Sequence, residues 1–342
     1  MSLLDPRRKA KLLAHRGARI GLVLIMLVLA FAVFGPLLAR SPLDSDFQNG
    51  ATPDGLPSAP SPIHWLGTDR LFRDVFARLA HGARTSLLVG FAATTIATTM
   101  GTLVGVISGW YEGTRGARIP WISIALLAAS FALLVAGRPP LAGGALASAI
   151  AIALVLPRVP RLAALARGAD VDADTALMRL VDVGLSFPFL LLVLALGAAL
   201  DRTTPTTIFV TLGLTGWLGT ARVVRAKTMQ VRNLDFVLAA RALGRSTPSI
   251  LFVHVIPSVL GPILVLSTAA VAQMILAESA LGYLGAGIAP PAPTWGHMLY
   301  EGQDNYAIAP WLVAAPAVAI LFTVFGFNLL GEGLRDAFDP RD

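Results

Sequence analysis

Side chains that could catalyse a reaction are scarce in this chain of 342 residues. It has no cysteine, which removes thiol nucleophiles, thiolate metal sites and disulfides together. The five histidines show no i,i+3 or i,i+4 pair that would form a helical metal site; they are His15, His64, His81, His254 and His297. We therefore expect no metal and no cofactor bound to this chain.

Motifs for nucleotide binding and for nucleophilic catalysis are also missing. A phosphate-binding loop needs glycine before a Lys-Ser/Thr pair, and the only Lys-Thr pair, Lys227-Thr228, follows Ala226. No Gly-x-Ser-x-Gly nucleophile elbow occurs. The chain is thus not expected to be an enzyme or to bind ATP by that route.

Composition decides the broad class of protein. Hydrophobic residues make up 55% of the chain and charged residues 14%, with a mean hydropathy of +0.71. A soluble domain carries roughly a quarter charged residues, and disordered chains are rich in charge. We therefore predict an all-α polytopic membrane protein whose surroundings are the lipid bilayer. The net charge of +7 is attributed to basic loops at the membrane and not to a nucleic-acid partner.

Eight segments without charged residues are long enough to cross a hydrocarbon core, which takes about 20 residues of helix. They are Ile20–Ala39, Thr85–Tyr111, Ile119–Gly137, Pro139–Pro157, Val183–Leu200, Thr203–Ala221, Ser246–Ala277 and Asn305–Gly331. The first span, residues 20–39, follows a basic tail over residues 1–19 and lacks a small-residue cleavage site, so we expect it to remain uncleaved. The other seven lie in a membrane domain over residues 85–342.

Basic residues predict the orientation of these spans. If the amino terminus is cytoplasmic and all eight segments cross, 20 of the 27 Lys and Arg residues fall in inside loops or tails. Cytoplasmic loops carry such an excess. Both termini are therefore expected inside a cytoplasmic membrane, with residues 40–84 outside.

The outside loop over residues 40–84 has two different halves. Its first half is rich in Pro, Gly, Ser and Asp, which is typical of irregular turns. In its second half, apolar residues fall on one helical face: Leu71, Phe72, Val75, Phe76 and Leu79. Thr68 or Asp69 could cap this helix and Gly82 could end it. We predict a short amphipathic helix that either anchors at the membrane interface or docks an external partner.

Two features of the spans have a physical interpretation of their own. Glu278 is the only acidic residue near the end of a long apolar run, and such a group at membrane depth is a candidate for a pathway or gate. A satisfied structural carboxylate near the outer interface is the alternative. Gly101, Gly105 and Gly109 repeat every four residues on one helical face, which favours close helix packing.

The inside loop over residues 231–257 carries a short predicted helix. Asp235 can start it, the residues from Phe236 to Leu243 favour helix, and Gly244 stands where a left-handed C-cap belongs. The small side chains of Ala239 and Ala240 leave a flat surface that another protein can approach. Such a helix between two spans is either a handle for a soluble motor or an ordinary connector.

This segment resembles the EAA loop of binding-protein-dependent ABC importer permeases. Ala239, Ala240, Gly244 and the ending Val255-Ile256-Pro257 match the pattern, and Leu238 occupies the usual Glu position. Other blocks resemble the dipeptide/oligopeptide and nickel subfamily: HWLGTD from His64, Arg73-Asp74, GARTSLLVG from Gly82, LMRLVDVGLSFP from Leu177, AARALG from Ala239, ESALGYLGAG from Glu278, PTWGHML from Pro293 and AFDPR from Ala337. Together they extend over residues 64–341.

The sequence departs from the family pattern at two places. Members usually pass from a turn such as GWYEG at Gly109–Gly113 almost directly into the LMRLVD block, whereas residues 114–171 intervene here with two apolar segments. The usual six spans would become eight through this inserted apolar hairpin. Phe72 occupies a position that is usually Gly, so the local turn is expected to differ.

The resemblance implies a type I-like ABC importer transmembrane domain of six core helices plus the extra two-helix hairpin, in a bacterial cytoplasmic (inner) membrane. It implies a second homologous permease subunit, two ATPase subunits that bind ATP and Mg, and an extracytoplasmic solute-binding protein that delivers peptides. The residues implied to contact an ATPase are Leu234, Asp235, Phe236, Leu238, Ala239, Ala240, Arg241, Ala242, Leu243 and Gly244. Closure of the ATPases would rock the bundle between inward- and outward-open states.

Other functions stay open at this point. Within the same family, the solute could be a nickel chelate or another small molecule. A stand-alone channel or secondary carrier is a different class, although carriers often show internal repeats and several intramembrane ionisable groups, and here only Glu278 qualifies.

Overall fold

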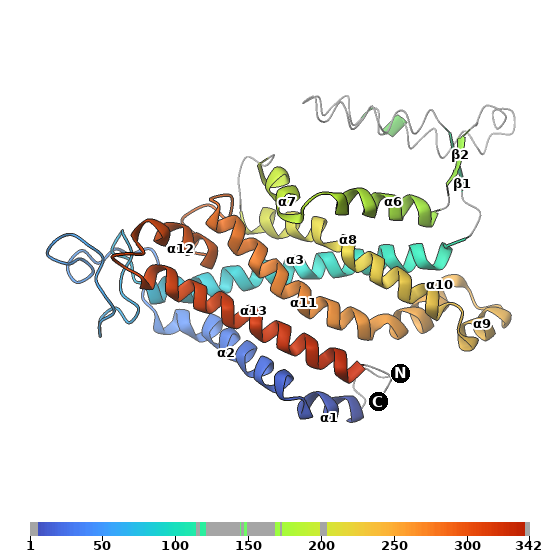
Figure 1. Cartoon of the computed structure of the whole chain (residues 1–342), viewed down its shortest axis with the longest axis horizontal. Coiled ribbons are helices and arrows are strands. Elements are labelled where there is room, and N and C mark those ends of the chain that lie inside the picture. Colours follow the sequence, from blue (N-terminus) through green and yellow to red (C-terminus); the bar gives the residue numbers. More distant parts are fainter. Residues whose placement is uncertain are drawn as a thin grey trace. The chain divides into compact units, whose positions relative to one another are not determined.

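The computed structural model describes residues 6–113, 117–120, 144, 147–148, 168–171, 173–198 and 204–338. Among the described residues the regular elements are helices apart from two four-residue strands, and residues 40–74 form an irregular loop, which confirms the expected helical class (Figure 1). It forms two compact units, one made of Met1–Val106 with Val183–Asp342 and the other of Ile107–Asp182.

The first unit is a bundle of long apolar helices joined by short ones. In chain order its elements are α1 (Pro6–Ala14), α2 (Arg16–Leu38), α3 (Val75–Tyr111, up to Val106), the end of α6 (Ala173–Ser186), α7 (Phe189–Ala198), α8 (Pro205–Val231), α9 (Asp235–Ala242), α10 (Thr247–Ile250), the π-helical η3 (Leu251–Val255), α11 (Ile256–Tyr283), α12 (Trp295–Gly302), the 3₁₀ turn η4 (Gln303–Asn305) and α13 (Trp311–Phe338). Within the described residues, five helical stretches are long and apolar enough to cross a membrane: α2, α3, α8, α10 to α11, and α13.

Close packing of α2 against α13 builds one side of this bundle (Figure 1). A Cβ atom added to Gly21 would lie 2.6 Å from the carbonyl oxygen of Gly326, so only glycine fits at this crossing. Small residues let helices approach closely where lipid provides no hydrophobic drive for their association. The core of the unit continues through α3, α11 and α12, where the side chain of Trp295 is fully buried.

The predicted amphipathic helix over residues 68–82 is wrong, because α3 begins only at Val75 and continues through Gly82. Asp74 caps it, and its Oδ1 accepts the backbone N–H of Ala77 at 2.8 Å. Gly82 does not end the helix, since its backbone packs against the first turn of α12, where a Cβ would lie 3.4 Å from Trp295. Tertiary packing of this kind outweighs the weak helix propensity of one glycine.

The apolar segment predicted as a single span over Val183–Leu200 is broken. α6 ends and α7 begins on either side of Phe187-Pro188, and the two helices differ in direction by 88°. Proline has no amide hydrogen and disfavours the helical conformation of the residue before it. If the bent pair is one span, the described residues hold six.

A proline also changes the helix that follows α9. The stretch from α10 to α11 is continuous, but η3 is π-helical, and the N–H of Ile256 donates to the carbonyl of Leu251 five residues earlier. Pro257 lacks the amide hydrogen that an α-helical bond to Val253 would need. The missing donor explains why the wider turn lies here.

The second unit contains a small antiparallel ribbon. β1 (Ala117–Pro120) pairs with β2 (Gly168–Val171) in the register Ala117 to Val171. These strands, which the apolar pattern did not predict, join the two ends of the insertion expected over residues 114–171. The predicted spans Ile119–Gly137 and Pro139–Pro157 lie outside the described residues, apart from the start of the first, which belongs to β1, and three isolated positions.

Candidate functional site

The predicted helix in residues 231–257 is present as α9, with the expected left-handed glycine behind it. Gly244 has a φ of +75°, and the N–H of Arg245 donates to the carbonyl of Ala240 at 3.1 Å. The N–H of Leu243 donates to the carbonyl of Ala239 at 2.9 Å. These bonds satisfy carbonyls that the end of a helix otherwise leaves unpaired. A Cβ at Gly244 would meet nothing within 4 Å, so its backbone conformation alone requires glycine.

Most of α9 faces away from the bundle. Val237 and Ala240 are buried and hold the helix in place, and the ring of Phe236 lies 6.0 Å from the imidazole of His254. The other side chains are exposed, and Leu243, just behind the helix, is 85% exposed. Leu238, at the usual Glu position, is also exposed and offers an apolar contact. An exposed helix with apolar side chains suits a groove on another protein.

The two ends of the first unit differ. Figure 1 shows α9, α10 and the start of α2 at one end, which we call the α9 end. Residues 40–74 and α12 lie at the opposite end, which we call the loop end. Any partner bound to α9 is therefore separated by the length of the bundle from a partner bound at the loop end.

The glycine repeat of α3 lies against α8. A Cβ at Gly101 would be 2.8 Å from the carbonyl oxygen of Trp217, and one at Gly105 would be 2.6 Å from that of Ala221. Both glycines occur where the two backbones nearly touch. Gly109 is buried and belongs to the second unit.

Glu278 is fully buried near the end of α11. The hydroxyl of Ser279 donates to its Oε2 at 3.5 Å, and the side chains of Ser86 and Thr294 lie beside the carboxyl. Its Oε1 has no hydrogen-bond partner among the described residues. The carboxyl is thus enclosed by α3, α11 and the start of α12.

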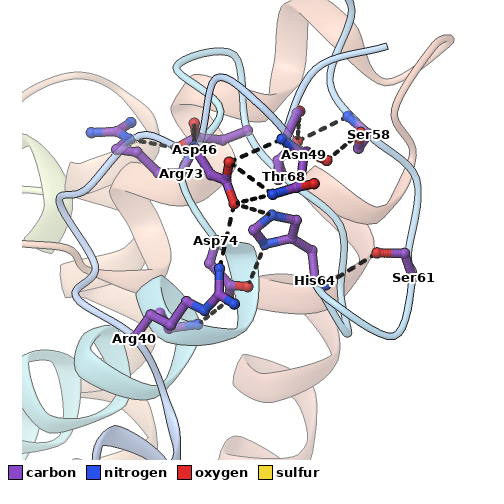
Figure 2. A network of polar contacts seen from close by, with 12 residues as sticks. Arg40, Asp46, Asn49, Ser58, Ser61, His64, Thr68, Arg73 and Asp74 are labelled. Atoms are coloured by element: carbon purple, nitrogen blue, oxygen red, sulfur yellow. Dashed lines mark hydrogen bonds and ion pairs between the residues drawn. The ribbon is translucent and has the colours of Figure 1, made fainter.

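A histidine between two carboxylates organises the loop end (Figure 2). His64 is buried, with Nδ1 2.8 Å from Asp74 Oδ2 and Nε2 3.5 Å from Asp46 Oδ2. Backbone N–H donation from Asn49, which stabilises the ionised form, holds the pKa of Asp46 below its usual value. These contacts tie the irregular loop to Asp74, the cap of α3.

Beside it, four charged side chains form a cluster between α3 and α12, which we call the outer ion-pair cluster: Asp69, Arg73, Arg78 and Glu301. Arg73 bonds Asp69 at 2.7 Å and Glu301 at 3.0 Å, and Arg78 pairs with both carboxylates. Burial raises the pKa of Glu301, but a hydrogen bond from His297 and the charges of Arg78 and Arg73 outweigh it and lower that pKa to about 2.

A cavity of about 500 Å³ lies beside the outer ion-pair cluster and is also lined by Leu71 and Tyr300. The charged groups that line it are paired with one another. Among the described residues, no group of three or more His, Asp and Glu side chains could hold a metal ion.

Sequence reasoning missed both clusters at the loop end. The blocks HWLGTD, Arg73-Asp74 and PTWGHML contain or adjoin most of their members, but nothing in the sequence pairs residues 69–78 with Glu301 more than 200 positions later. Phe72, flagged as unusual in its block, has a φ of +57° and is the only described non-glycine residue with a positive φ. Phe72 therefore adopts the left-handed backbone conformation that favours glycine.

A bundle of apolar helices long enough to cross a membrane, with a short exposed helix at one end, defines a class of protein: a polytopic membrane protein. Similarity to known families narrows this class to transport proteins. Residues 162–341 match the family described as binding-protein-dependent transport system inner membrane component. Residues 8–57 match the N-terminal TM domain of oligopeptide transport permease C.

Curated relatives agree along most of the chain. The oligopeptide transport system permease protein OppC of Bacillus subtilis is 33% identical over 96% of this chain and 87% of its own. The dipeptide transport system permease protein DppC of Alkalihalophilus pseudofirmus is 32% identical over 98% and 90%. The glutathione transport system permease protein GsiD of Pectobacterium atrosepticum is 30% identical over 93% and 84%.

The chain belongs to the family of binding-protein-dependent transport system inner membrane components and is a permease subunit of an ABC importer. Membership implies an inner-membrane location and partner ATPase and substrate-binding subunits. The resemblance seen in the sequence is thereby confirmed.

Proposed function

We propose that this permease moves di- or oligopeptides across the cytoplasmic membrane by ATP-driven alternating access. It would do so with a second homologous permease subunit, two ATPase subunits that bind and hydrolyse ATP with Mg, and an extracytoplasmic solute-binding protein. The peptide solute is supported by the named relatives, which are permeases of oligopeptide, dipeptide and glutathione systems.

The α9 end and both termini would face the cytoplasm, and the loop end would face outside. The distribution of Lys and Arg supports this orientation, since most of them fall in the tails and loops of the α9 side. The described ends of the chain also lie at that side (Figure 1). The ATPases would then meet the α9 end and the solute-binding protein the loop end.

The observation that carries the coupling proposal is the geometry of α9. A helix of eight residues, anchored by Val237 and Ala240 and closed by Gly244 in a left-handed conformation, exposes the rest of its surface. An ATPase that grips the exposed residues from Leu234 to Leu243 can move the helix without unfolding the bundle. Glu278 is proposed as a pathway or gate group, and Gly101, Gly105 and Gly109 as packing residues.

The test compares two substitutions at Gly244 in the complete transporter reconstituted in vesicles. Gly244→Val forces a β-branched residue into the left-handed conformation, which disturbs the end of α9. Gly244→Asn is the matched control, because asparagine adopts that conformation more easily. We measure peptide-stimulated ATP hydrolysis, uptake of a radiolabelled tripeptide and co-purification of all subunits.

We expect Gly244→Val to assemble normally but to lose at least about tenfold in stimulated hydrolysis, while Gly244→Asn stays close to wild type. Wild-type coupling in Gly244→Val would refute the role of α9. Absence of tripeptide uptake by the wild-type complex would refute the peptide assignment instead, and uptake without ATP would indicate a channel or secondary carrier.

A further inference from the structure

A second cavity, of about 600 Å³, lies within the first unit between α7, α8 and α11. Its walls are formed mainly by apolar side chains, among them Phe189, Leu190, Leu218, Met274 and Leu276. None of the described residues that line it is charged. The cavity therefore suits an uncharged, apolar group.

One polar side chain in this wall is out of place for a lipid-facing surface. Gln273 lies in the apolar stretch Thr247–Tyr283, and it is exposed where it lines the cavity. Its amide forms no hydrogen bond within the described part of the chain. A primary amide without partners in hydrocarbon costs several kcal/mol, so Gln273 needs water, a polar ligand or another chain as its partner.

The other polar group of the wall cannot supply a donor. The hydroxyl of Thr215 already donates to the carbonyls of Thr211 and Leu212, at 2.9 and 3.1 Å. Gln273 is thus the cavity residue with both donor and acceptor capacity to offer. A primary amide has two N–H donors and one carbonyl acceptor, which complement the C=O and N–H of a peptide unit.

We propose that this cavity is a subsite of the translocation pathway that receives an apolar side chain of the transported peptide. The Gln273 amide pairs with the peptide backbone next to that side chain. The inference rests on the proposed function and adds to it the part of the permease that contacts the solute. Met274 lines the same wall, and its flexible thioether can adapt to side chains of different shape.

Gly219 provides the first test, because a Cβ added there meets nothing within 4 Å and points into open space. Gly219→Phe should fill the cavity without disturbing the helices. Gly197→Phe is the matched control, since Gly197 on α7 also has open space at its Cβ position but does not line the cavity. Uptake of Ala-Phe-Ala and of Ala-Gly-Ala is measured in vesicles that contain the complete transporter.

We expect Gly219→Phe to lower the ratio of Ala-Phe-Ala to Ala-Gly-Ala uptake at least about fivefold relative to wild type, and Gly197→Phe to leave the ratio unchanged. Equal ratios in the two variants would overturn the subsite while leaving the proposed function intact. If the wild-type complex takes up neither peptide, the result would count against the proposed function itself.

The amide is tested with a second matched pair. Gln273→Leu keeps the size of the side chain and removes its hydrogen bonds, and Asn328→Leu removes an exposed amide of α13 that does not line the cavity. Loss of about one hydrogen bond to the solute predicts a decrease of about fivefold in Ala-Gly-Ala uptake for Gln273→Leu alone. Equal effects of the two substitutions would refute the role of Gln273.

The remaining occupants of the cavity are a lipid chain and the second permease subunit. Because the chain has no cysteine, Gly219→Cys introduces a single thiol. A charged, membrane-impermeant maleimide applied to both faces of the reconstituted complex should label this thiol, and saturating Ala-Phe-Ala should slow labelling. A thiol that stays unlabelled would show a cavity filled by lipid or covered by the partner, and either result would overturn the proposal.

Discussion

Replacement of Gly105 by alanine tests how closely α3 and α8 approach each other. The new Cβ would lie 2.6 Å from the carbonyl oxygen of Ala221 and 2.8 Å from Cβ of Val224, whereas ordinary contacts are 3.4–4 Å. The helices must therefore separate locally by about 0.8 Å at the carbonyl. A gap of this size forfeits a quarter to a half of the dispersion energy along the contact.

The expected cost follows from two opposing effects. Overpacking costs about 1–3 kcal/mol, and the better helix propensity of alanine returns about 0.8–1 kcal/mol. We expect Gly105→Ala to lower the free energy of unfolding by up to about 2 kcal/mol. Gly219→Ala on α8 is the control, since nothing lies within 4 Å of its Cβ position, and it should gain about 0.5–1 kcal/mol.

The two variants should thus differ by about 0.5–3 kcal/mol, which for a chain of 342 residues corresponds to roughly 1–4 °C in the apparent Tm of the purified protein in detergent. Tryptophan fluorescence during heating is a suitable measurement. If Gly105→Ala melts at or above the temperature of Gly219→Ala, the two helices do not make the contact that the structure shows.

Two further predictions concern the loop end. Phe72→Gly removes about 1–2 kcal/mol of left-handed strain but loses the edge contact with Phe47, so its free energy of unfolding should stay within about 1 kcal/mol of wild type. Phe72→Val keeps the strain, so trypsin should cut this variant at Arg70 faster than it cuts Phe72→Gly. Equal cleavage rates in the two variants would contradict the strain. Because the pKa of Glu301 is lowered to about 2, its ionised form contributes stability that is present above the unfolded pKa of about 4.5 and is lost as the pH falls towards 2. The difference in Tm between wild type and Glu301→Gln should therefore be larger at pH 7 than at pH 3. A difference that does not change with pH would show that the charge of Glu301 does not contribute to stability.

How far the sequence predicts this protein depends on the range of the interaction. The helix α9 and its glycine cap depend on ten consecutive residues alone, and both were predicted. Five of the eight predicted spans lie on helices long and apolar enough to cross a membrane, because length and hydropathy are properties of a segment alone. Two others lie almost wholly outside the described residues. The break at Phe187-Pro188 was not predicted. The spans were chosen by the absence of charged residues, and this criterion ignores proline, which interrupts a helix.

Features that depend on tertiary contact were missed or misread. Gly82 was expected to end a helix, but it lies inside α3, where it packs against the first turn of α12. The outer ion-pair cluster joins Arg78 to Glu301 across the chain, which no spacing rule reveals. The Gln273 cavity likewise needs three helices to be placed before its wall exists.

The contacts of the first unit bear on how movement at α9 could reach the solute. α9 is anchored by Val237 and by the Phe236–His254 ring contact, and His254 belongs to η3, which continues directly into α11. Gln273 lies on that same helix, so the proposed coupling helix and the proposed subsite share one continuous element. At the loop end, α12 follows α11 and is held to α3 by the outer ion-pair cluster. A displacement of α9 is therefore expected to shift the wall of the subsite relative to α7, whose link to α6 bends at Pro188, while the outer ion-pair cluster keeps α3 and α12 together.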